Sequence, residues 1–393
     1  MNKLYRFSLK ALALAAISFA ATPAQAQLGN IGDLLQAGKE DANKIVEAYM
    51  APMANAFGAG LNTGWILNAN AHSGFLPIPL PGFSLQLRAS GTMIPTDDQR
   101  FDLTALGLSS NISFPGSTTS PTIAGDDQDK GQIRVSQNVT YTDPVSGNVI
   151  TESVPIADLT LPEGLGVPYI PAPMVQAGIG LLFDTDLTVR YFPKTDFGDY
   201  GSVELIGASI KHGIDQWIPG GGLLPVNITL QAGFTQFKSS VNLDLKPIDL
   251  ITDANRSQVA NYSYGSGYFD NQGIQFETTS WTVNAVVGKK LSLLIVGVGA
   301  YVGAGIESSE TILKMNGNYP LLVVNDNVTE FIQGETLKVT DISNPIDLTF
   351  SGTNSIRLLG GVRVSLGIFD FFGEYTYAKY SSANVGFAIS FRS

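Results

Sequence analysis

The segment 385–392, close to the C-terminal end of the chain, places a large apolar residue at every second position. These residues are Val385, Phe387, Ile389 and Phe391, and small or polar residues stand between them. A period of two is typical of a β-strand with one apolar and one polar face. The character of the second face in the other strands decides whether the apolar face points inward or outward.

Three further ranges, 226–235, 296–306 and 361–368, repeat this alternation. In 296–306 the second face carries four glycines and one tyrosine. Glycine has no side chain, so this face cannot fill a core. Apolar residues outside and small or polar residues inside are typical of a membrane-spanning barrel. We therefore predict an all-β fold, a transmembrane antiparallel up-and-down β-barrel of about twelve to fourteen strands over residues 60–393.

Residues 1–26 have the parts of a secretory signal peptide. Three basic residues lie within the first ten positions, the apolar stretch 9–21 follows, and the small residues Ala24 and Ala26 flank Gln25. This pattern predicts export and cleavage after Ala26. With a barrel, it predicts localisation in the cell outer membrane of a Gram-negative bacterium, with membrane lipid and the outer-membrane assembly machinery as partners.

Charge and composition limit the function. Removal of the signal peptide takes three of the 23 basic residues and leaves 20 against 34 acidic ones, a net charge of −14. Such an acidic chain is not expected to bind nucleic acid. The chain has no cysteine, so we expect neither disulfides nor thiolate metal sites.

The residues that could carry chemistry are few. The two histidines, His72 and His212, have no metal-ligand spacing, and no cofactor motif is present. His72 precedes Ser73, which could form half of an acyl-transfer pair, but a polar residue at a barrel rim is the simpler interpretation. The acidic stretch 126–129 is interpreted as an exposed loop rather than a cation site. We expect no catalytic, cofactor or metal residues and no enzyme activity.

Residues 27–59 differ from the rest and predict a short helical segment. Asp33 can cap a helix that runs to about Met50, and Pro52 is expected to end it. Such a helix can lie in the barrel lumen as a plug or extend into the periplasm. The inward glycines of 296–306 favour the plug, because they leave room along the wall. The first strand is expected at 60–71, where the closing C-terminal strand would pair with it.

Five charged residues fall on predicted inward faces, and charges inside a barrel must meet water or each other. They are the lumenal candidates Arg88, Arg190, Glu204, Arg363 and Glu374. They could pin a plug, or they could line a polar path. The sequence leaves both alternatives open.

Segment 211–222 breaks the strand pattern, because Ile214, Trp217 and Ile218 have helical spacing and Pro219 follows. It is either a short amphipathic helix at the membrane interface or a turn beneath the barrel rim.

Four motifs carry a resemblance that covers most of the mature chain. They are Gly38 to Tyr49 with Pro52, Gly58 to Trp65, Val189-Arg190-Tyr191, and Gly207 to Gly213 followed by Gln216 to Pro219. In these the chain resembles a family of Gram-negative outer-membrane barrels without an assigned activity. In layout alone it is similar to the long-chain fatty-acid transporter barrels, which hold an N-terminal helical hatch in the lumen. Their Asn-Pro-Ala signature is absent, so the likeness implies transport only through architecture.

Three functions follow as expectations. The first is an outer-membrane channel or transporter for hydrophobic or amphipathic small molecules. The second is a structural or surface-interaction barrel whose long loops, 96–130, 248–272 and 314–345, bind a partner. The third, a barrel enzyme, rests only on the two histidines.

Overall fold

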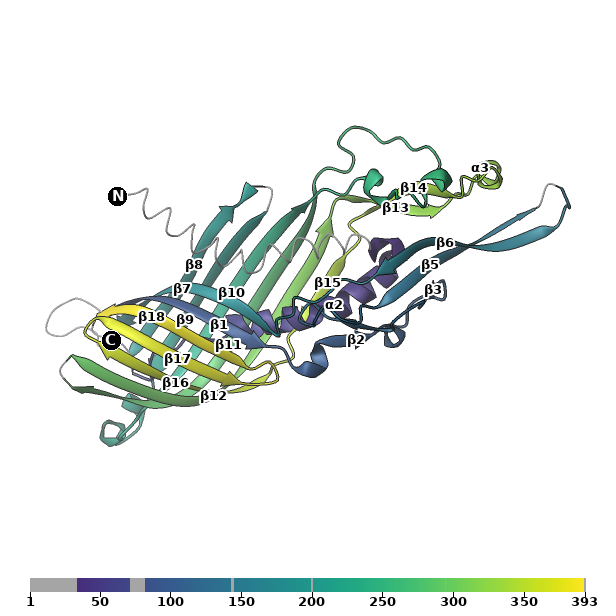
Figure 1. Cartoon of the computed structure of the whole chain (residues 1–393). Coiled ribbons are helices and arrows are strands. Elements are labelled where there is room, and N and C mark those ends of the chain that lie inside the picture. The colour runs from purple at the N-terminus through teal and green to yellow at the C-terminus, as the bar shows by residue number, and fades with distance from the viewer. Residues whose placement is uncertain (1–33, 71–81, 143–144, 199–200, 294, 392–393) are drawn as a thin grey trace.

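The computed structural model describes residues 34–70, 82–142, 145–198, 201–293 and 295–391 (Figure 1). The predicted signal peptide and His72 lie outside these ranges.

In the described part of the chain, ten strands form a closed antiparallel ring, because β11 pairs with both β10 and β12. In chain order the ring strands are β1 (Phe83–Met93), β7 (Tyr169–Leu181), β8 (Thr185–Asp196), β9 (Ser202–Gly213), β10 (Asn227–Leu243), β11 (Gln272–Leu293), β12 (Val296–Asn316), β16 (Ile356–Leu366), β17 (Phe369–Tyr377) and β18 (Ser382–Phe391). β15 (Asp347–Ser351) pairs with the end of β12 beside β16. The predicted β-barrel fold is confirmed.

The ring has fewer strands than predicted, and it begins later. The ranges expected as two strands near 131–158 form the hairpin of β5 (Gln132–Thr142) and β6 (Val149–Thr160), which pairs with β3 (Ile112–Ser113) and not with the ring. Strand β5 has the alternation of a barrel strand, with Ile133, Val135 and Val139 on one face, but Ile133 and Val135 are buried in the cluster around the plug. The expected strand 60–71 is also wrong, and β18 closes the ring on β1 instead.

The alternation of faces is confirmed in the described strands. On β12, Val298 and Val302 are 52% and 66% exposed, whereas Gly299 and Tyr301 are buried. The last strand follows the same rule: Phe391 points out and Ser390 points in.

The two ends of the barrel differ. At one end the connections between β7 and β8, β11 and β12, and β16 and β17 are turns of two or three residues, and we call this the short-turn end. At the other, the long-loop end, the connections include residues 94–168, 244–271 and 317–355.

The long loops carry the remaining small elements. These are β2 (Arg100–Asp102), β4 (Thr119–Pro121), β13 (Asn318–Val324), β14 (Leu337–Ser343), α3 (Val328–Ile332), η2 (Thr96–Asp98), η3 (Leu103–Leu106), η7 (Pro247–Leu250) and η8 (Arg256–Gln258). At the short-turn end lie η5 (Asp215–Trp217) and η6 (Gly221–Leu223). Figure 1 shows the β5–β6 and β13–β14 hairpins projecting beyond the barrel at the long-loop end.

A helix runs down the lumen. After η1 (Leu35–Ala37), helix α2 (Lys39–Leu61) begins among the long loops and contacts strands from several sides of the ring, including β1, β7, β11 and β12 (Figure 1). We call residues 34–70 the plug. Among the described residues, no helix has both the length and the apolar composition needed to cross a bilayer.

The expectation that Pro52 ends this helix is wrong, because α2 continues for nine more residues to Leu61. A proline within a helix removes one backbone hydrogen bond and strains the preceding turn. Here Met50 and Ala54 on either side are buried, so packing against the surrounding wall holds the helical path.

Candidate functional site

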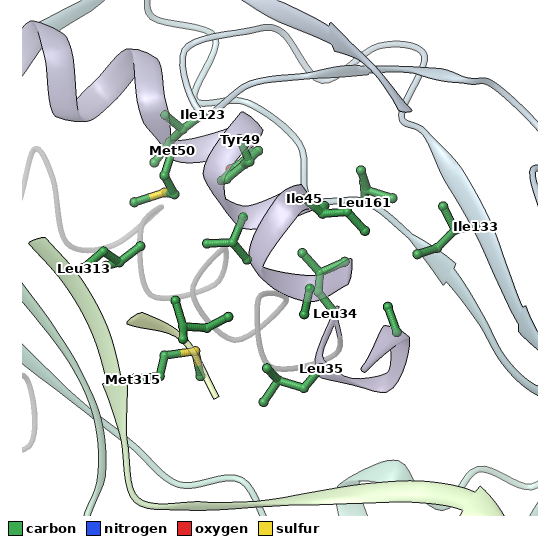
Figure 2. Close-up of a cluster of buried hydrophobic side chains, with 14 of the residues drawn as sticks. Leu34, Leu35, Ile45, Tyr49, Met50, Ile123, Ile133, Leu161, Leu313 and Met315 are labelled. Atoms are coloured by element: carbon green, nitrogen blue, oxygen red, sulfur yellow. The ribbon is translucent and has the colours of Figure 1, made fainter. Parts of the chain in front are cut away.

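The outer half of the plug, residues 34–50, is held by apolar packing under the long loops. Its buried side chains meet loop and strand-end residues in one cluster, shown in Figure 2: Leu34, Leu35, Ile45, Tyr49, Met50, Ile123, Ile133, Leu161, Leu313 and Met315. The helical spacing of Leu34, Ala42, Ile45 and Tyr49 places them against this cluster. Burial of apolar surface is the main attraction in this half.

Hydrogen bonds also join the outer half to the loops at several points. The Tyr49 hydroxyl donates to the Glu163 carbonyl at 2.8 Å, and the Ile123 amide donates to the Tyr49 carbonyl at 3.1 Å. The Asp41 carboxylate accepts from the Ser109 amide at 3.1 Å. These bonds fix loop 94–168 over the entrance of the lumen.

Further down, small residues bring the helix against the wall. A Cβ added to Gly58 would lie 2.5 Å from the Cβ of Ser309 on β12, and one added to Gly60 would lie 2.9 Å from the Thr92 hydroxyl on β1. Only glycine allows so close an approach of helix and strand. Phe57 faces the opposite side, with its ring centroid 4.7 Å from that of Phe237.

The helix ends at arginine side chains of the wall. Arg190 on β8 donates to the Leu61 carbonyl at 2.7 Å and to the Thr63 carbonyl at 2.5 Å. Arg357 on β16 donates to the Asn62 carbonyl at 2.9 Å. The last carbonyls of a helix lack intrahelical partners and form the negative end of its dipole, so cations stabilise them.

Past the helix, the chain continues as an irregular segment with its backbone bonded to the wall. Glu374 on β17 accepts from the Gly64 amide at 2.9 Å and from the Tyr301 hydroxyl at 2.7 Å. The Ile66 carbonyl accepts from Arg88 on β1 at 3.1 Å and from Tyr301 at 3.2 Å. We call residues 61–70 the inner segment.

The inner segment ends near the short-turn end on a lysine. Lys211 on β9 donates to the Asn68 carbonyl at 3.0 Å and to the Asn70 carbonyl at 2.7 Å. It also pairs with the Asp186 carboxylate at 2.9 Å, and both side chains are buried. The backbone of the plug is therefore bonded to the wall from the end of α2 to residue 70.

Aromatic rings cover two of the guanidinium groups. Arg190 lies 3.5 Å from the centroid of the Trp65 ring, and Arg88 lies 4.0 Å from that of Phe372. A cation over an aromatic face is attracted by the ring, and this attraction offsets part of the free energy lost when the cation leaves water. The arginines are thus held by rings and by carbonyl oxygens together.

Two other arginines form buried ion pairs. Arg357 meets the Glu307 carboxylate at 2.9 Å, and Arg363 meets the Asp370 carboxylate at 2.7 Å. All four side chains are at most 2% exposed. Removing one member of such a pair leaves an uncompensated charge, which is far more costly than the pair is stabilising.

The structure places the five predicted lumenal residues as follows. Arg88, Arg190 and Glu374 point inward and bond the plug backbone. Arg363 also points inward but bonds Asp370 and Ser390 on the wall. The prediction for Glu204 is wrong.

Glu204 lies on the outward-facing row of β9 with Ile206, and its neighbour Leu205 is the residue that points inward. Leu205 packs against Leu61 of the plug. The alternation at the start of β9 is therefore one residue out of step with the prediction.

Sequence reasoning missed Lys211, Tyr301, Arg357 and Glu307. Each lies on an inward row that the alternation defines; Arg357, for example, shares its row with Arg363. The alternation of the sequence could therefore have identified these residues as inward-facing.

In segment 211–222, residues 211–213 still belong to β9, and the rest forms short 3-10 turns, η5 and η6, rather than one amphipathic helix. Trp217 is 65% exposed there, and its indole nitrogen donates to His212 at 2.8 Å. The Thr185 hydroxyl lies 2.8 Å from the other ring nitrogen of His212.

Comparison with known proteins gives a family and a set of distant structures. The outer membrane transporter YddB from Escherichia coli is 12% identical, with a TM-score of 0.28, over 78% of this chain and 41% of its own. This chain thus spans about two-fifths of that transporter. The toluene transporter TodX from Pseudomonas putida is 8% identical, with a TM-score of 0.22, over 82% of this chain and 95% of its own. No curated protein matches the sequence. A model of a family of unknown function (DUF6588) matches residues 1–391, and the chain belongs to that family.

Proposed function

We propose that the protein is an outer-membrane channel whose lumen is closed by the plug and which passes hydrophobic or amphipathic small molecules when the plug moves. A continuous outward apolar surface supports the membrane location. It includes Leu87, Val189, Ile210, Val302 and Val362, each at least 41% exposed. So large an exposed apolar surface is not stable in water.

Aromatic side chains stand near both ends of this surface. Tyr169 and Tyr377 lie at the long-loop end and are 51% and 64% exposed, and Trp217 lies at the short-turn end. Tyrosine and tryptophan are enriched where a membrane meets water. The even strand number and the contrast between short turns and long loops are also typical of outer-membrane barrels.

The observation that carries the channel proposal is the way in which the plug is held. The chain has no cysteine, so no disulfide ties the plug to the wall, and the wall side chains Arg190, Arg88 and Lys211 bond its backbone. Hydrogen bonds of this kind can be exchanged for bonds to water or to a ligand, so the plug can leave without unfolding the ring.

The lumen offers an apolar region and a polar one. Phe57, Phe237 and Phe276 form an aromatic group between the plug and the part of the wall nearer the long-loop end. Phe192 and Leu205 lie nearby. The charged anchors of the inner segment lie below it. A wall with this division suits a molecule that has an apolar part and a polar part.

The test uses anchor variants of the full chain. Arg190→Met should raise single-channel conductance in planar bilayers and speed uptake of a fluorescent hydrophobic probe by cells. Arg134→Met is the matched control, because Arg134 pairs with Asp158 on the exposed β5–β6 hairpin outside the lumen. If a folded Arg190→Met protein conducts and takes up probe no better than the control, the plug does not gate a channel.

A cavity among the long loops favours a second candidate, a surface-binding protein. The β5–β6 hairpin and α3 border an open cavity of about 520 Å³, lined in part by Tyr141, Phe331 and Ile332. A tyrosine side chain on a loop is suited to contacts with a partner. Replacing Tyr141 and Phe331 by serine should abolish adhesion of expressing cells to a target surface. Such a loss, combined with a closed lumen in every anchor variant, would favour this candidate over the channel.

A further inference from the structure

Two of the buried lumenal arginines are bonded to uncharged oxygens. Within the described residues, Arg190 donates to two plug carbonyls, the Gln176 side chain and the Thr235 hydroxyl. Arg88 donates to the Ile66 carbonyl and to the side-chain oxygens of Gln86 and Asn384. Arg357, Arg363 and Lys211, by contrast, each meet a carboxylate.

The buried charges of the wall are therefore not fully balanced by ion pairs. The buried basic residues of the ring strands are Arg88, Arg190, Lys211, Arg357 and Arg363, and the buried acidic ones are Asp186, Glu307, Asp370 and Glu374. Three of the acidic residues are taken by ion pairs, and Glu374 accepts from Gly64 and Tyr301. The carbonyl oxygens of the plug backbone give Arg190 and Arg88 hydrogen-bond acceptors, as a carboxylate would, but without its negative charge.

Resting on the proposed channel, we infer that Arg190 and Arg88 form a binding site for the carboxylate of an amphipathic anion, and that the plug occupies this site with its own carbonyls when the channel is closed. Arg190 presents two terminal nitrogens to two separate oxygens, those of Leu61 and Thr63. A guanidinium group holds a carboxylate through the same paired donors.

A further observation points to a ligand at this position. The ring of Trp65 covers the Arg190 guanidinium, and its indole nitrogen is a buried donor without an acceptor among the described residues. The aromatic group of Phe57, Phe237 and Phe276 lies on the long-loop side and would receive an apolar tail.

The site couples ligand and plug. Withdrawal of the inner segment removes the plug carbonyls from Arg190 and Arg88 and leaves each cation with neutral wall acceptors only, which is unfavourable. An anion that binds them favours the open state, and without it the plug carbonyls return. A neutral molecule of the same shape lacks this differential affinity.

The first experiment is a titration of the full-length protein in detergent. The chain has three tryptophans, so Trp217→Phe and Trp281→Phe leave Trp65 as the single reporter beside Arg190. Decanoate should expose Trp65 to acrylamide in a saturable manner, with an apparent affinity about tenfold or more above that of decanol. Arg190→Met in this background should remove the preference, and Arg134→Met should keep it. Equal responses to decanoate and decanol would overturn the site, as would an unchanged preference in Arg190→Met.

Inorganic phosphate in the same titration separates a general oxyanion site from one that needs the apolar tail. Exposure of Trp65 by decanoate but not by millimolar phosphate is the expected result. Equal effects of phosphate and decanoate would overturn the assignment of an amphipathic ligand.

The second experiment separates the site from the channel. Gly58→Phe places a ring where Ser309 stands and should force the plug from the wall while every lumenal cation remains. Gly91→Phe is the control, because a Cβ there meets nothing within 4 Å. In a bilayer with a KCl gradient, the Gly58→Phe current should reverse at a potential that shows preference for chloride. A cation-selective current would contradict the inference and leave the channel standing. Absence of current would contradict the channel, and the Trp65 titration would still decide the site.

Discussion

The two parts of the plug are held in different ways. The outer half, residues 34–50, is buried among apolar side chains of the long loops and is also joined to these loops by several hydrogen bonds. The inner segment, residues 61–70, has its backbone bonded by charged and polar side chains of the wall. Apolar packing is non-directional, whereas hydrogen bonds require particular distances and angles.

The difference has a functional meaning. An apolar contact stabilises a range of similar positions, but the bonds of the inner segment fix one register of the plug. Loss of a single bond leaves a buried donor or acceptor without a partner, which costs more than the bond contributes. The inner segment is therefore the part whose release is abrupt, as a gate requires.

The largest expected effect belongs to the inner segment. Arg357→Met removes the partner of the Asn62 carbonyl and leaves the buried Glu307 carboxylate unpaired. The free energy of unfolding should fall by about 3–5 kcal/mol, measured by urea titration in detergent. The double variant Arg357→Met with Glu307→Gln should recover a large part of this loss. A double variant as unstable as the single one would show that the ion pair is not the source.

A cavity in the outer half should lower the free energy of unfolding by nearly as much as Arg357→Met, but it should leave the channel closed. Ile45→Ala removes a fully buried side chain from the apolar cluster and should cost about 2–5 kcal/mol. Hydrogen exchange should then rise in residues 34–50 and in loop 94–168, while conductance remains at the wild-type level. An open channel in Ile45→Ala would remove the functional distinction between the two parts.

Two glycines allow a matched comparison of strain. Gly38 in the outer half has φ +87°, and a Cβ added there would meet nothing within 4 Å. Gly64 in the inner segment has φ +72°, and a Cβ added there would lie 2.7 Å from the Asn384 amide nitrogen. Alanine at either position carries a backbone cost of about 1–3 kcal/mol, because a residue with a Cβ is strained at such a positive φ. Gly64→Ala should cost about 1 kcal/mol more, because Asn384 also accepts from Arg88 and cannot shift freely. Equal melting temperatures of the two variants would contradict this.

The smallest effect concerns one hydroxyl of the outer half. Tyr49→Phe loses the bond to the Glu163 carbonyl and should cost about 0.5–1.5 kcal/mol near neutral pH. Burial, with help from the nearby Glu163 charge, raises the pKa of the Tyr49 hydroxyl above its ordinary value of 10.0.

Since the folded state holds this proton more tightly than the unfolded state, the stabilisation is complete below about pH 10 and is lost as the pH rises toward the folded-state pKa. The stability difference between wild type and Tyr49→Phe should therefore shrink above about pH 10. A difference that grows with pH would reverse the sign of this argument.

The sequence predicted the barrel wall far better than the lumen. Alternation alone identified the outward faces of β12, β16 and β18, because every inward or outward choice is repeated along a strand. It failed at Glu204, where a strand begins and the repeat is short. It failed for β5 and β6 because a soluble hairpin and a barrel strand can share the same period.

The plug was harder to predict for a physical reason. Local rules ended the helix at Pro52 and began a strand at Gly60, but packing inside a closed wall outweighs both preferences. The anchors bond backbone carbonyls, which every residue of the plug possesses, so its sequence carries no mark of them. Arg190 could be placed in the lumen from its strand, but its partners could be found only in three dimensions.

The presence of the inner segment within the lumen is tested most directly by cysteine labelling at Thr63. The chain has no cysteine, and Thr63 is 1% exposed beneath Arg190. In the intact barrel, Thr63→Cys should resist a hydrophilic maleimide, whereas Asp127→Cys on an exposed loop should label at once. Addition of Arg190→Met should make the cysteine at 63 reactive. Labelling of Thr63→Cys at the rate of the loop cysteine in an otherwise unaltered barrel would show that the lumen is not closed by this segment.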